Sequence, residues 1–63
     1  MSGPAPREVY FEFTRIGPSV KVAAIDATTG VEVTVIGPAT AAPADLQQLA
    51  LAKLRARLAK EGR

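Results

Sequence analysis

Polar and apolar residues alternate strictly between Glu8 and Thr14, which is the period of a strand with one buried face. Two later runs, at residues 19–26 and 31–36, alternate in the same way and are rich in β-branched residues, which suit a pleated sheet. We therefore predict three strands, at about residues 8–15, 19–26 and 31–36.

Two short segments that contain glycine predict how these strands connect. Gly17-Pro18 suits a two-residue hairpin loop, because glycine supplies the positive φ that a type II′ turn requires. After the second strand, the Asp26 side chain can accept hydrogen bonds from nearby backbone N–H groups, and Gly30 can take the left-handed position. With these loops the apolar residues of all three strands share one face of an antiparallel sheet. The residues that then lie side by side are Phe11, Ala24 and Val33, and likewise Phe13, Val22 and Val35.

The segment at residues 43–61 consists mainly of strong helix formers and begins with proline, which suits the first helical position. Its apolar residues recur at helical spacing and form a stripe about 140° wide. We predict an α+β fold, in which a three-stranded antiparallel meander in the order 1-2-3 is packed on one face by this C-terminal helix. The predicted core consists of Val9, Phe11, Phe13, Val20, Val22, Val33, Val35, Leu46, Leu54 and Leu58.

The length of 63 residues corresponds to one domain, which we place at residues 7–63 after a flexible N-terminus at residues 1–6. The chain contains no cysteine and no histidine, so it lacks the commonest nucleophile, acid-base and metal-binding side chains. We expect no catalytic residues, no cofactor and no metal site, and we do not expect an enzyme. The missing cysteines and the absence of a long apolar segment indicate a soluble cytoplasmic protein without membrane contact.

The net charge of +2 is unevenly distributed. Residues 1–42 carry three basic and four acidic side chains, whereas residues 43–63 carry five basic and two acidic side chains. Lys53, Arg57 and Lys60 share one side of the predicted helix and are candidate contacts to nucleic acid. The same cations also complement the helix dipole near its C-terminus, and the chain has few aromatic residues for base stacking. The sheet is a poorer candidate for binding DNA, because its outer face carries several glutamates.

The outer face of the sheet also carries apolar residues. In the predicted register Tyr10 lies opposite Ile25, with Ala23 and Ile36 nearby, and such a patch on a small protein is typical of a contact surface. A second candidate is Leu49, which shares one side of the helix with several alanines. The strand at residues 31–36 is a further candidate, because it lies at an edge of the sheet with Glu32 as its one charged residue. The leading interpretation is a non-catalytic protein–protein interaction protein that forms a homodimer or binds another protein. The alternative is a nucleic-acid-binding module that uses the basic helix.

Several short motifs between residue 7 and about residue 60 form a recognisable set. They are Arg7-Glu8-Val9-Tyr10-Phe11-Glu12-Phe13, Val20-Lys21-Val22, Ala24-Ile25-Asp26, Thr29-Gly30, Glu32-Val33 and Gly37-Pro38-Ala39. Together they resemble a family of short alphaproteobacterial proteins known as a domain of unknown function. The resemblance implies a compact bacterial protein with the domain boundaries given above, and it assigns no functional residues.

Overall fold

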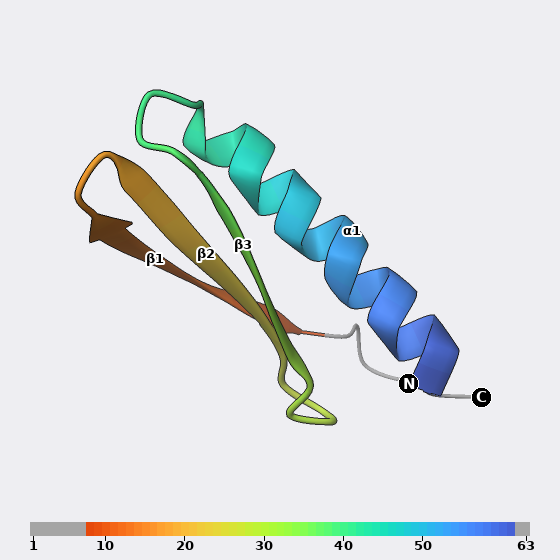
Figure 1. Cartoon of the computed structure of the whole chain (residues 1–63). Helices are drawn as coiled ribbons and strands as arrows, with labels where there is room; N and C mark the ends of the chain where they lie inside the picture. The colour runs from red at the N-terminus through yellow and green to blue at the C-terminus, as the bar shows by residue number, and fades with distance from the viewer. Residues whose placement is uncertain (1–7, 62–63) are drawn as a thin grey trace.

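A computed structural model of the chain describes residues 8–61, so the predicted flexible N-terminus at residues 1–6 lies outside the described part. The elements are strand β1 (Val9–Ile16), strand β2 (Ser19–Asp26), strand β3 (Glu32–Pro38) and helix α1 (Pro43–Glu61). The strands form one antiparallel sheet in the order β1-β2-β3, and α1 runs along one face of that sheet (Figure 1). The predicted α+β fold is confirmed, and each predicted strand lies within two residues of its observed bounds.

The register of the sheet also agrees with the prediction. Phe11 pairs with Ala24, which pairs in turn with Val33, and the neighbouring row contains Phe13, Val22 and Val35. The two-residue loop between β1 and β2 has Gly17 at φ +57°, and Gly30 has φ +78° in the second turn. Both glycines therefore adopt the left-handed backbone that their turns require.

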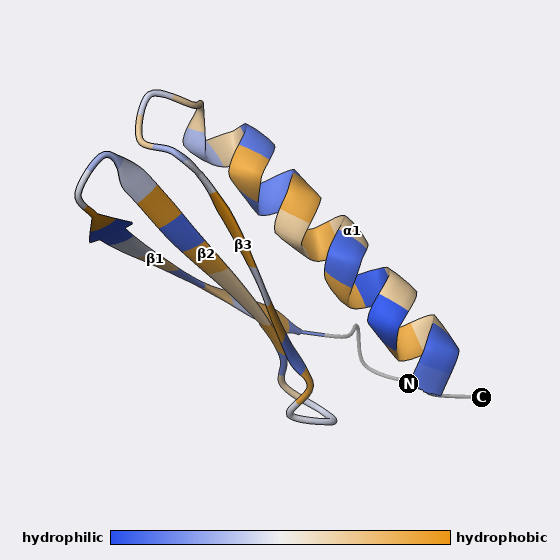
Figure 2. Ribbon diagram, in the orientation of Figure 1, coloured by the Kyte–Doolittle hydropathy of each residue, from blue (hydrophilic) through white to orange (hydrophobic). Residues whose placement is uncertain are grey.

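Helix α1 packs mainly on β2 and β3. The buried side chains of its stripe, Leu46, Ala50 and Leu54, pack against the apolar residues of the sheet. Figure 2 shows hydrophobic and hydrophilic segments alternating along α1. The N-terminal part of the helix lies very close to β3, since a Cβ atom added at Gly37 would lie 2.5 Å from Cδ2 of Leu46. The lack of a side chain at Gly37 thus allows the end of β3 and the first turns of α1 to pack closely.

One predicted core residue is not in the core. Phe13 is 45% exposed, although its side chain is on the face of the sheet that carries the helix. The reason is the width of the elements, because a helix about 10 Å across covers roughly two strands that are about 4.8 Å apart. The buried core consists of Val22, Ala24, Val33, Leu46, Ala50 and Leu54. Most of the other predicted core residues, Val9, Phe11, Val20, Val35 and Leu58, are partly buried around it.

Candidate protein-interaction surface

The two faces of β1 carry different candidate residues. On the outer face, Tyr10 pairs with Ile25 as predicted, and its side chain is 55% exposed. Its hydroxyl group donates a hydrogen bond of 3.3 Å to the Glu8 carboxylate. Tyr10 therefore presents most of its ring to solvent while its polar end is tied to the neighbouring side chain.

The predicted four-residue patch on the outer face is not continuous. Ile36 is opposite Lys21, four positions along β2 from Ile25, and a row that contains Ala23 and Thr34 lies between. Ala23 is only 3% exposed, because a small side chain on the central strand is covered by its longer neighbours. The apolar surface is thus divided, with Tyr10 and Ile25 at one end of the face and Ile36, 68% exposed, near the other.

Leu49 lies outside the buried stripe of α1, and it is 59% exposed. The alanines of the same strip, Ala52, Ala56 and Ala59, are exposed as well. Helix α1 lies over the inner face of the sheet (Figure 1), whereas Tyr10 is on the outer face of β1, so this strip and the Tyr10 side chain are on different sides of the molecule. The two candidate surfaces are therefore alternatives and do not form one site.

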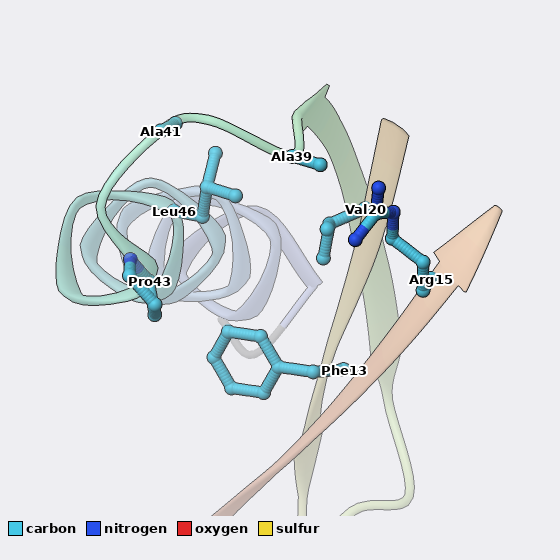
Figure 3. Close-up of a pocket in the computed structure, with 7 residues that line it drawn as sticks. All are labelled: Phe13, Arg15, Val20, Ala39, Ala41, Pro43 and Leu46. Atoms are coloured by element: carbon cyan, nitrogen blue, oxygen red, sulfur yellow. The ribbon is translucent and has the colours of Figure 1, made fainter. Parts of the chain in front are cut away.

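A groove between β1 and the start of α1 was not anticipated from the sequence. It has a volume of about 280 Å³ and lies at the hairpin end of the sheet. The Phe13 ring points from β1 toward the helix and Pro43, while Arg15 and Val20 line the opposite wall (Figure 3). The remaining lining residues are Ala39, Ala41 and Leu46. The sequence already predicted one helix and three strands, and this ratio could have indicated that the helix leaves part of the sheet uncovered.

Two of the three candidate nucleic-acid contacts have partners within the chain. The Lys53 ammonium group donates a hydrogen bond of 2.7 Å to the backbone carbonyl of Thr34 on β3. The Arg57 guanidinium group forms an ion pair with Glu61, one turn further along the helix. Lys60 is exposed near the C-terminal end of α1. The basic side of the helix is therefore partly neutralised by an acidic residue and partly engaged with the sheet.

Within residues 8–61, no three or more acidic side chains are grouped so that they could hold a metal ion. In the same part of the chain, α1 is not apolar over enough of its length to cross a membrane. The chemistry that the described surface offers is apolar contact, backbone hydrogen bonding along strand edges and scattered single charges.

The fold and this surface define a small βββα protein with one helix over a three-stranded meander. The chain belongs to the family described as Domain of unknown function (DUF6898), whose model matches residues 6–61. This match covers nearly the whole chain and agrees with the single domain that the fold displays. No curated protein and no solved structure matches the chain significantly.

Proposed function

We propose that this chain is a non-catalytic protein–protein interaction protein that associates with a second copy of itself. The observation that carries the proposal is the concentration of exposed apolar residues on one strand. Of the five large apolar side chains that are exposed among residues 8–61, three are on β1: Tyr10, Phe13 and Ile16. Three exposed apolar side chains along one edge strand of so small a protein favour a contact along that strand over a solvated face.

The shape of the molecule supports the same proposal. Its radius of gyration is 13.1 Å, compared with about 11 Å for a compact chain of this length. Its accessible surface is 4447 Å², compared with about 3900 Å² for a compact monomer of 6.6 kDa. A second copy would cover the apolar surface that the single helix leaves open.

The nucleic-acid alternative depends on the basic side of α1. Because Lys53 is bonded to β3 and Arg57 to Glu61, contact with phosphate would require both side chains to leave their present partners. Dependence on salt distinguishes the two functions. Binding to phosphates weakens steeply as salt is added, whereas association through apolar side chains is nearly independent of salt. The alphaproteobacterial origin and the cytoplasmic location stay predictions from the sequence.

The proposal is tested by light scattering coupled to chromatography, over a wide range of protein and salt concentrations. We expect a dimer whose population rises with protein concentration and changes little with salt. The double variant Tyr10→Glu, Ile25→Lys should weaken the dimer, while Leu49→Glu, which places a charge on a different side of the molecule, should leave it intact. Circular dichroism checks that each variant keeps its fold. A wild-type monomer at every concentration would refute self-association, and loss of the dimer in Leu49→Glu alone would transfer the contact to the helix.

A further inference from the structure

The two edges of the sheet are protected to different extents. An edge strand presents unpaired backbone N–H and C=O groups, which form a template for another strand unless side chains or other elements cover them. At the β3 edge, the Lys53 ammonium group bonds to the Thr34 carbonyl, and Pro38 closes the strand without an N–H group. The β3 edge, which the sequence suggested as a contact site, is therefore better protected against pairing than the β1 edge. β1 runs for eight residues without a proline at the other edge.

The hydrogen bonding next to β1 identifies the backbone groups that face outward. The amide of Ala27 donates to the carbonyl of Glu8 at 3.0 Å, so the even-numbered residues of β1 turn their backbone groups toward β2. The odd-numbered residues turn theirs to the free edge. These residues are Val9, Phe11, Phe13 and Arg15, and their side chains are on the same face as the helix.

We infer that β1 pairs with β1 of a second copy in antiparallel orientation, about a two-fold axis at Phe13. This inference rests on the proposed self-association and identifies its surface and geometry. The product is a continuous six-stranded sheet with both helices on one face. In this register Phe13 exchanges its two backbone hydrogen bonds with Phe13 of the partner subunit, as the residues of a hydrogen-bonded antiparallel pair do.

The exposed side chains of β1 select this register. A two-fold axis at Phe13 places Tyr10 opposite Ile16 of the partner subunit on the outer face, and the two Phe13 rings together on the inner face. The three exposed apolar side chains of β1 are Tyr10 (55% exposed), Phe13 (45%) and Ile16 (51%). In this register each of them gains an apolar neighbour. Arg15 comes to lie opposite the Phe11 ring of the partner subunit, a pair that allows cation–π contact.

In the registers with the axis at Glu12 or Phe11, the residues that face each other across the strand pair are less compatible. An axis at Glu12 would place two glutamates directly opposite each other, which is destabilising because like charges repel across a strand pair. An axis at Phe11 would place Tyr10 opposite Glu12 of the partner subunit and leave Ile16 without a partner strand residue. The axis at Phe13 instead places Glu12 opposite Thr14 of the partner subunit, where no like charges meet.

Proline substitution tests the edge, because it removes an N–H group. Phe13→Pro removes an outward N–H from each subunit and leaves the hydrogen bonds between β1 and β2 in place. The matched control is Glu32→Pro, since Glu32 is on the guarded β3 edge, and Ala24 and Val33 carry the bonds between β2 and β3 there. We expect Phe13→Pro to raise the dimer dissociation constant by at least about tenfold, from two lost hydrogen bonds alone. Glu32→Pro should leave it nearly unchanged. Both are measured by sedimentation equilibrium, with circular dichroism to monitor the fold.

Disulfide cross-linking tests the register independently, because the natural chain contains no cysteine. Glu12→Cys and Thr14→Cys are prepared as separate proteins, mixed and oxidised. The two positions face each other across the axis as a non-hydrogen-bonded pair, where side chains are closest. The mixture should therefore yield a cross-linked heterodimer much faster than either protein alone.

The outcomes separate this inference from the function on which it rests. If wild type is a monomer, both fail. If wild type dimerises and Phe13→Pro dimerises equally well, or the mixed cysteine proteins cross-link no faster than each alone, the edge pairing is wrong and the proposed self-association stands. Loss of the dimer in Phe13→Pro together with the specific cross-link in the mixture supports the six-stranded sheet.

Discussion

At the scale of single residues, Asp26 is notable because its charged side chain is fully buried. Its carboxylate oxygen Oδ2 accepts hydrogen bonds of 2.8 Å from both the amide and the hydroxyl group of Thr29. The hydroxyl oxygen in turn accepts a bond from the amide of Val31. The side chain thus fixes the turn between β2 and β3, because it satisfies groups that the turn would otherwise leave buried or unpaired.

We expect Asp26→Ala to lower the free energy of unfolding by about 2 kcal/mol, because it removes a charged acceptor from two hydrogen bonds that hold the turn. Urea unfolding followed by circular dichroism measures this loss. Thr29→Val is the matched control: it removes the two bonds of the hydroxyl group, to Asp26 and from Val31, but keeps the bond from the Thr29 amide to the charged carboxylate, so it should cost less than Asp26→Ala. Equal stability of Asp26→Ala and wild type would show that the turn does not depend on this side chain.

At the scale of elements, the absence of a side chain at Gly37 makes room for the Leu46 side chain where α1 packs on β3. A methyl group on Gly37 would overlap the end of the Leu46 side chain, whereas the same group on Gly17 would meet no atom within 4 Å. The two glycines are therefore required for different reasons. Gly37 is required for close packing, and Gly17 for its φ of +57°.

This difference predicts a specific coupling between substitutions. Gly37→Ala should cost about 1–2 kcal/mol in wild type, because the helix or Leu46 must shift. In a Leu46→Ala background the same change should cost less than about 0.5 kcal/mol, because the cavity accommodates the methyl group. Gly17→Ala should cost the same in both backgrounds, since its strain is in the backbone.

The stabilities are compared by urea unfolding in a buffer that contains a stabilising osmolyte, which keeps the weaker variants folded. Additive costs for Gly37→Ala and Leu46→Ala would show that the two residues do not limit the approach of the helix.

At the scale of the whole molecule, the protein is a thin plate of 44 × 25 × 16 Å with one helix over two of three strands. A monomer of this shape buries little apolar surface, so we expect its stability to be small, and the proposed self-association would cover part of the remaining apolar surface. If only folded chains associate, formation of the dimer stabilises the folded state by mass action.

We therefore expect the thermal midpoint of wild type to rise as the protein concentration rises, because unfolding is then coupled to dissociation. Phe13→Pro, whose dimer is weaker, should show a smaller rise over the same range of concentrations. Differential scanning calorimetry over a hundredfold range of concentration, about the range over which mass action is readily resolved, measures both. A midpoint independent of concentration in wild type would contradict the coupling.

The sequence by itself determined the elements and their register. Strict alternation specifies which face each strand residue occupies, and the loop at Gly17-Pro18 specifies the partner of every residue in β1, so both can be read from local pattern. The proline at residue 43 and the leucine stripe likewise locate the helix and its buried side without any knowledge of the sheet. These features depend on interactions between residues close together along the chain.

The tertiary structure alone decided which strands the helix covers, and therefore which apolar residues stay exposed. The alternation of β1 and β2, together with their register, assigns Phe13 and Val22 to the same face, yet Val22 is fully buried and Phe13 is 45% exposed. Only the position of α1 over β2 and β3 distinguishes them, and the lack of a side chain at Gly37 allows Leu46 to pack there. The same placement brings Lys53 to the Thr34 carbonyl and guards one edge of the sheet. Burial depends on the width and placement of a packed element, which are properties of the assembled layers and not of the periodicity of any one segment.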